Sequence, residues 1–162
     1  MIPAKFDYVK PASLADAVAA LQQAGDDAKI IAGGQSLLPV LRLRMAAPSV
    51  VVDLGGIAEL KGIREDGDKV VIGAMTPYYD ILRDDLVKQH LTLLAQAVAT
   101  VADNQVRHRG TLGGALAHAD PAGDLGAPAL VLDAEMVITG PGGTRTVAAA
   151  DFFQGLFSTA LG

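Results

Sequence analysis

Apolar side chains recur at helical spacing near the start of the chain. Positions 14, 17, 18 and 21 are apolar, which places them on one face of a helix. Ser13 is expected to cap the N-terminus of this helix, with Asp16 favourable in its first turn. Gly25 is expected to end it. The pattern therefore predicts an amphipathic helix between Ser13 and Gly25.

Two short apolar runs that follow are typical of strands. Residues 29–32 are predicted to form a short buried strand, and residues 49–53 a second one closed by a Gly-Gly pair. Between them, residues 37–44 are expected to be helical, with Pro39 tolerated because it lies in the first turn. The first third of the chain is thus expected to be a small lobe of strands and helices.

The pattern changes near residue 56. Asp66-Gly67-Asp68 and Pro141-Gly142-Gly143 each separate two extended runs, which predicts β-hairpins over residues 62–73 and 135–147. Helices are expected over residues 78–83, with Thr76 as the N-cap and Pro77 at the first helical position, and over residues 89–102 and 125–132. Residues 106–124 are interpreted as a long loop, and a helical turn is expected from residue 151. This mixture predicts an α+β fold with subdomains 1–56 and 57–162, rather than a doubly wound parallel sheet.

Composition narrows the function classes. The 162 residues are 51% hydrophobic and 19% charged, as expected of a folded chain, and 18 are glycine. Without cysteine the chain can neither form disulfides nor hold a Cys-ligated cluster. A net charge of −5 argues against a general nucleic-acid binder. There is no long apolar run and no signal-peptide pattern, so a cytoplasmic protein without a membrane span is expected. The spacing of the three histidines predicts no metal site.

Two glycine-containing loops are the candidate chemistry. Ala32-Gly33-Gly34-Gln35-Ser36 follows a predicted strand, and Thr111-Leu112-Gly113-Gly114-Ala115 follows two arginines, Arg107 and Arg109. Each joins paired glycines to a hydroxyl side chain, and successive backbone N–H groups in such turns suit a phosphate. Neither matches a dinucleotide-binding or Walker A motif. Each alone is also compatible with an ordinary tight turn, whereas both together could clamp a diphosphate from two sides.

These two loops, with Leu-Leu-Pro after the first and Ala119-Asp-Pro-Ala-Gly-Asp124 after the second, resemble the FAD-binding medium subunits of molybdenum hydroxylases. Carbon monoxide dehydrogenase and xanthine dehydrogenase belong to that group. The resemblance covers the whole chain. It implies the two-subdomain FAD-binding fold of vanillyl-alcohol oxidase-like (PCMH-type) flavoproteins, with FAD between the lobes.

The resemblance also implies which residues contact FAD. The pyrophosphate would be held by two stretches, namely Lys29, Ile30, Ile31, Ala32, Gly33, Gly34, Gln35 and Ser36, and Thr111, Leu112, Gly113, Gly114 and Ala115. Asp124 would bind the ribose or adenosine end, and Val101 would make an apolar contact. No side chain need act as a catalytic acid or base, because the redox chemistry belongs to the cofactor.

The implied function is electron relay in a flavin-dependent oxidoreductase complex. A molybdenum-cofactor large subunit would oxidise the substrate. An iron–sulfur small subunit would carry electrons to FAD, and NAD or another acceptor would then receive them. Two alternatives stay open, namely a cofactor-poor docking module of the same complex and a non-redox phosphate-ligand binding protein. FAD would colour the purified protein yellow, which distinguishes the first function from both alternatives.

The last residues carry a further expectation. In the family, a C-terminal domain follows the region that corresponds to Phe152-Phe153-Gln154-Gly155, and this sequence is expected to lack it. Weak FAD affinity is expected for that reason. Burying a large apolar side chain is worth about 1.5–3 kcal/mol. Phe152, Phe153, Leu156 and Phe157 are therefore expected to drive association or to fold back onto the chain.

Overall fold

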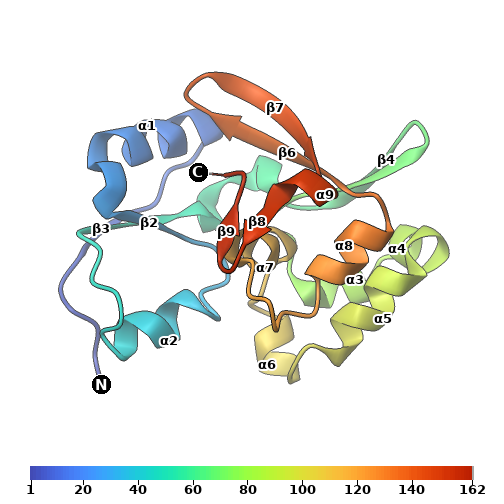
Figure 1. Ribbon diagram of the computed structural model, residues 1–162, viewed down its shortest axis with the longest axis horizontal. Coiled ribbons are helices and arrows are strands. Elements are labelled where there is room, and N and C mark those ends of the chain that lie inside the picture. The colour runs from blue at the N-terminus through green and yellow to red at the C-terminus, as the bar shows by residue number, and fades with distance from the viewer. Residues whose placement is uncertain (162) are drawn as a thin grey trace.

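The computed structural model describes residues 1–161, and its N-terminal part is a small parallel sheet with two helices (Figure 1). Strands β1 (Asp7–Val9), β3 (Val50–Asp53) and β2 (Ala28–Ile31) lie side by side in that order, and both pairings are parallel. Parallel neighbours need crossover connections. Helices α1 (Leu14–Ala24) and α2 (Leu37–Arg42) lie in these connections. Val51 and Val52 of the central strand are fully buried, as are Ala17 of α1 and Leu41 of α2.

The predicted caps of α1 are confirmed, but the prediction for β2 needs a correction. Ser13 accepts a hydrogen bond from the Asp16 N–H (3.1 Å), and Gly25 ends the helix with φ +64°. The strand expected to be buried is an edge strand, and its Lys29 and Ile30 are exposed. Only β3 has neighbours on both sides, so burial follows sheet order rather than the apolar run itself.

Helices dominate the second part of the chain (Figure 1). Helices α3 (Tyr78–Arg83), α4 (Asp85–His90), α5 (Thr92–Thr100) and α8 (Gly126–Val131) enclose a core of Tyr78, Ile81, Val87, Leu94, Val98 and Leu125. The single helix expected over residues 89–102 is instead two, because Leu91 leaves the helical conformation (φ −127°, ψ 45°). Leu94 and Val98 are the buried residues of α5.

Two hairpins form where the turn sequences placed them. Strand β4 (Ile63–Asp66) pairs antiparallel with β5 (Lys69–Ile72), and β6 (Glu135–Gly140) pairs with β7 (Gly143–Ala148). Gly67 and Gly143 adopt positive φ in these turns, which glycine allows without strain. An ion pair between Lys69 and Glu135 joins the two hairpins. Short 3₁₀ turns occupy Gly25–Asp27, Leu54–Gly56 and Ala58–Leu60.

Two expectations for this part were wrong. Thr76 does not cap α3, because its buried hydroxyl accepts from the Gly62 N–H and donates to the Gly62 carbonyl. Residues 106–124 are not one loop, since α6 (Asn104–Arg107) ends there and α7 (Leu112–His118) lies within it. Thr111 caps α7, so the second glycine-containing loop is the start of a helix.

The last described residues form a short helix, α9 (Ala149–Phe152), and a small hairpin of β8 (Phe153–Gly155) and β9 (Ser158–Thr159). Phe152 is 3% exposed, so α9 is packed inward. Leu156 and Phe157 lie in the hairpin turn and are 76% and 58% exposed. Of the four apolar side chains expected to need cover, Phe152 is thus buried, Phe153 is half-buried, and two are exposed. None of the helices within residues 1–161 is both long and apolar enough to cross a membrane.

Candidate functional site

The two glycine-containing segments, far apart in the sequence, meet in the structure. A Cβ atom added to Gly33 would lie 2.7 Å from the carbonyl carbon of Arg109 and 2.8 Å from the Cα of Gly110. A Cβ on Gly114 would lie 3.2 Å from the Cβ of Ala32. The backbone after β2 is therefore packed directly on the backbone before and within α7. Glycine is required at position 33 because the neighbouring atoms are backbone and cannot move aside.

Residues 110–113 are fixed from behind by the segment that follows β5. The Gly113 N–H donates to the Ala74 carbonyl (2.9 Å), and the Leu112 N–H donates to the Thr76 carbonyl (3.2 Å). A Cβ on Gly113 would lie 2.5 Å from the Cβ of Ala74. Sequence analysis treated residues 76 and 77 of this support only as a helix start, and it assigned none of residues 74–78 a role in the site.

Tyr78 completes this support. Its N–H donates to the Gly110 carbonyl (3.0 Å), and its ring lies 2.6 Å from the position of a Gly110 Cβ. Burial, and secondarily the carboxylate of Asp124, raises the pKa of Tyr78 to about 12. Tyr78 therefore packs directly against the loop on which Gly33 rests.

The amides at the start of α7 already have acceptors within the protein. Besides those of Leu112 and Gly113, the Gly114 N–H donates to Thr111 Oγ1 (3.2 Å) and the Ala115 N–H to the Thr111 carbonyl (3.1 Å). The Thr111 residue itself is only 4% exposed. In this structure the segment is thus a helix start whose backbone N–H groups are hydrogen-bonded within the protein. The hydroxyl hydrogen of Thr111 is its remaining donor.

The backbone amides of residues 33–36, in contrast, have no acceptors of this kind. Within residues 1–161, the N–H groups of Gly33, Gly34, Gln35 and Ser36 donate to no protein acceptor, and the Ser36 side chain does not cap α2. Gly34 is buried and has φ +76°, a left-handed conformation that occurs in anion-binding loops. Buried backbone amides are normally paired, so the unpaired N–H of the buried Gly34 is a donor that an anion would satisfy. The N–H groups of the exposed Gln35 and Ser36 are also accessible to a ligand.

The remaining predicted residues are distributed around this pair of segments. Lys29 and Ile30 are exposed on the edge strand β2, and Ile31 and Ala32 are half-buried. Val101 is the C-cap of α5 and packs against the helical core, as does Leu112. Asp124 is exposed in the loop before α8.

Arg107 has a structural role that its sequence position did not reveal. Its guanidinium donates to the carbonyl of Val101 (2.6 Å) and to Asn104 Oδ1 (2.8 Å). These bonds satisfy the C-terminal end of α5 and tie it to α6. Arg107 is therefore committed to the fold, whereas the side chain of Arg109 is exposed.

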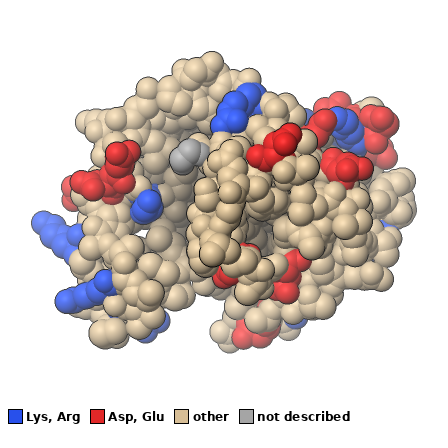
Figure 2. All heavy atoms as spheres, viewed as in Figure 1, with Lys and Arg blue, Asp and Glu red and all other residues tan. Residues whose placement is uncertain are grey.

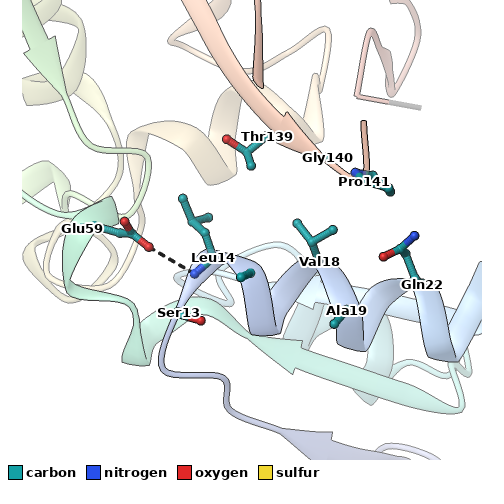
Figure 3. Close-up of a pocket in the computed structure, with 10 residues that line it drawn as sticks. Ser13, Leu14, Val18, Ala19, Gln22, Glu59, Thr139, Gly140 and Pro141 are labelled. Atoms are coloured by element: carbon teal, nitrogen blue, oxygen red, sulfur yellow. Dashed lines mark hydrogen bonds between the residues drawn. The ribbon is translucent and has the colours of Figure 1, made fainter. Parts of the chain in front are cut away.

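A groove of about 550 Å³ lies elsewhere, between α1 and the end of the β6–β7 hairpin (Figure 3). Leu14 and Val18 of α1 point toward Thr139, Gly140 and Pro141, and the Glu59 carboxylate accepts from the Leu14 N–H (3.1 Å). None of the residues predicted to contact FAD lines it. The groove is open and lined largely by small apolar side chains, and it lies along the contact between α1 and the hairpin.

Comparison with known proteins adds independent evidence. The model of the family described as the FAD binding domain in molybdopterin dehydrogenase matches residues 4–162. The chain is 49% identical over 161 residues to the carbon monoxide dehydrogenase medium chain of Hydrogenophaga pseudoflava, and 41% identical over 159 residues to the glyceraldehyde dehydrogenase medium chain of Sulfolobus acidocaldarius. These alignments cover 99% and 98% of this chain but 56% of each relative. The chain thus spans little more than half the length of these curated relatives.

Solved structures agree with the sequence matches. A structure of carbon monoxide dehydrogenase from Hydrogenophaga pseudoflava matches all of this chain and 56% of its own chain, with a TM-score of 0.98 and 49% identity. Quinoline 2-oxidoreductase from Pseudomonas putida 86 matches with a TM-score of 0.96 and 40% identity, again over 100% of this chain and 56% of that one. The family resemblance and the α+β fold expected from the sequence are confirmed.

Proposed function

Because this chain belongs to the family of FAD-binding domains of molybdopterin dehydrogenases, we propose that it binds FAD as part of the medium subunit of a molybdenum hydroxylase. The observation that carries the proposal is the contact between the two segments. It brings residues 33–36, whose backbone N–H groups have no protein acceptor within residues 1–161, beside the start of α7. A flavin supplies two-electron redox chemistry when bound. The contribution of this chain is to bind and orient it.

The hydrogen bonds suggest different roles for the two segments. Residues 33–36 would donate backbone N–H groups, and Ser36 its hydroxyl, to the pyrophosphate. Residues 111–115 would hold that loop in position, with the Thr111 hydroxyl as their direct contact. Asp124 would accept from ribose hydroxyls, and Val101 and the exposed residues of β2 would contact apolar parts of the cofactor.

The same family membership supports a two-subdomain architecture of the PCMH type, divided near residue 56. The parallel sheet has its own buried residues, and the helical part has another set around Ile81 and Val98. Gly33 belongs to the first unit and Gly110 to the second, so the proposed site lies where they meet. This position is common for cofactor sites.

We further propose that the chain acts in electron relay within a cytoplasmic complex that also contains a molybdenum subunit and an iron–sulfur subunit. The relatives named above support the complex but not one substrate, since their names cover carbon monoxide, glyceraldehyde and quinoline enzymes. The substrate would be selected on another subunit. NAD or another acceptor would receive the electrons.

Titration with FAD, ADP and riboflavin tests the proposal. Binding of FAD and ADP without binding of riboflavin is expected, because the pyrophosphate is the recognised group. Amide NMR of the same samples should show the largest shifts at residues 33–36, and smaller shifts at residues 112–114. ADP binding without FAD binding would favour the non-redox phosphate binder instead, and no binding of either would favour the docking module.

A further inference from the structure

The two phosphates of a diphosphate would find unequal donors in the candidate site. Residues 33–36 offer four backbone N–H groups that donate to no acceptor within residues 1–161. The backbone N–H groups of residues 112–115 already have protein acceptors, so the Thr111 hydroxyl is the donor that this segment keeps. The two-sided clamp expected from the sequence is therefore incomplete. One phosphate would have several backbone donors, and the other would need a donor from a different residue.

Arg109 lies where such a donor is needed. A Cβ atom added to Gly33 would come within 2.7 Å of the Arg109 carbonyl carbon, so the two residues are in direct backbone contact. The Arg109 side chain is exposed, and among residues 1–161 its guanidinium takes part in no ion pair. Residues 33–36 would span at most about 11 Å even if fully extended. A long side chain that starts at this contact can therefore reach an anion held by these residues.

The loop that carries Arg109 is held on both sides of it. The His108 ring stacks on the Tyr79 ring, with the ring centroids 4.0 Å apart and the planes at 26° to each other. The Gly110 carbonyl accepts a hydrogen bond from the Tyr78 N–H (3.0 Å). Binding an anion would thus order the Arg109 side chain but would not have to order its loop. A ligand residue of this kind loses little conformational freedom on binding.

The surroundings of Arg109 do not form a positively charged surface. Figure 2 shows acidic side chains over the part of the molecule where Figure 1 places α6 and α7. In the sequence, residues 103–124 contain three aspartates and two arginines. Arg107 donates to the end of α5, which leaves Arg109 as the arginine of this segment that is available to an anion. A phosphate here would therefore depend on one local cation rather than on a general positive field.

We propose that the Arg109 guanidinium binds the second phosphate of the ligand, so that residues 33–36 and Arg109 together select a diphosphate over a monophosphate. The inference rests on the proposed function, because residues 33–36 are taken as the site of the first phosphate. A planar guanidinium presents two parallel N–H donors to two phosphate oxygens, and such charge-assisted hydrogen bonds are about twice as strong as neutral ones. The ligand class selected is a dinucleotide with a central pyrophosphate. A mononucleotide with one phosphate would lack the Arg109 contact.

Titration of AMP, ADP and FAD against the wild-type chain and three variants tests the proposal. R109Q removes the positive charge and the paired donors, whereas R109K keeps the charge without the paired donors. The matched control R64Q removes the charge of another exposed arginine, which lies on β4. Thermal unfolding shows that each variant is folded before its affinities are compared.

The affinities should separate diphosphates from monophosphates. R109Q should weaken binding of ADP and FAD about tenfold or more, and binding of AMP less than about threefold, because AMP has no second phosphate. R109K should fall between R109Q and the wild type, and R64Q should bind all three ligands as the wild type does. Added salt should weaken ADP binding by the wild type more than ADP binding by R109Q.

A second measurement uses inorganic pyrophosphate as the probe and does not involve the flavin. The NMR signal of the Arg109 Nε–H group is identified by its absence in R109Q. This signal and the amide signals of residues 33–36 should shift with one common midpoint, because one ligand contacts both. Separate midpoints, or no shift of the Arg109 signal, would overturn the proposal.

The other outcomes are equally decisive. Unchanged ADP affinity in R109Q, equal weakening of AMP and ADP by R109Q, or the same loss in R64Q would overturn the role of Arg109. A wild-type chain that binds pyrophosphate with the common midpoint but does not bind FAD would refute the proposed function alone.

Discussion

Residues 33–36 and residues 111–114 carry similar sequence signals, paired glycines near a hydroxyl side chain, but their backbone amides differ. Those of residues 33–36 donate to no acceptor within residues 1–161, and those of residues 112–114 all have protein acceptors. In both segments the glycines let two backbones approach each other. Paired glycines therefore indicate that another backbone packs closely against the segment. The surrounding structure decides whether the backbone N–H groups bind a ligand or donate to protein acceptors.

The largest effect is expected from Gly33→Val, because the side chain would be forced against the backbone of Arg109 and Gly110. The unfolding free energy should fall by about 3 kcal/mol or more, and FAD binding should be lost. Urea unfolding and FAD titration measure the two effects. Gly142→Val is the matched control, since nothing lies within 4 Å of a Cβ at that position. Similar stability of the two variants would show that the segments do not meet as described.

The unfolding free energy should depend on pH through Tyr78, which packs against Gly110. Tyr78 has a pKa of about 12 in the folded chain, against 10.0 for an unperturbed tyrosine, so the folded state retains its proton longer. Its contribution is full below pH 10.0 and is lost as the pH rises toward 12, with a total of about 2–3 kcal/mol.

Unfolding by urea at several pH values across this range tests this, with Tyr78→Phe as the comparison. The difference between the two stability profiles removes the contributions of other groups, including Tyr8, whose pKa is raised by its hydrogen bond to Asp53. Parallel profiles above pH 10 would contradict the assigned burial of the Tyr78 hydroxyl.

A smaller loss is expected from Thr111→Val, which removes the oxygen that accepts from the Gly114 N–H. The unfolding free energy should fall by about 1 kcal/mol, the usual value of such a cap. Thr111→Ser keeps the oxygen and should lose less. Thermal unfolding of both variants provides the measurement. Greater destabilisation by Thr111→Ser than by Thr111→Val would mean that the methyl group, and not the cap, matters at this position.

The smallest change in stability is expected from Ser36→Ala. Its side chain is exposed and makes no capping bond, so the unfolding free energy should change by less than about 0.5 kcal/mol. FAD affinity should nevertheless weaken several-fold, by about 1 kcal/mol, because a hydrogen bond to the pyrophosphate is removed. Together, Ser36→Ala and Thr111→Val separate a ligand-facing segment from a supporting one. The comparison fails if Ser36→Ala leaves FAD affinity unchanged and Thr111→Val abolishes it without destabilising the chain.

Local signals explain where sequence analysis succeeded. The cap at Ser13, the end at Gly25 and the two hairpin turns depend on residues within a few positions of each other, and all are confirmed. The interpretation of residues 106–124 as a loop failed because the local signal was misleading there. Gly113 and Gly114 are poor helix formers, and α7 exists because Thr111 caps it and residues 74–76 accept its hydrogen bonds.

By itself, the sequence determined the α+β character, the hairpins and the identity of two glycine-containing segments specific enough to indicate the family. Apolar spacing and turn chemistry act over short distances, so they can be found without coordinates. Only the tertiary structure decided that β2 lies at a sheet edge, that Gly33 rests on Arg109, and that the amides of α7 are occupied. The pairing of β2, the contact of Gly33 with Arg109 and the acceptors of the Leu112 and Gly113 amides depend on atoms that folding brings together from positions more than 20 residues apart. No local pattern encodes which of them become partners.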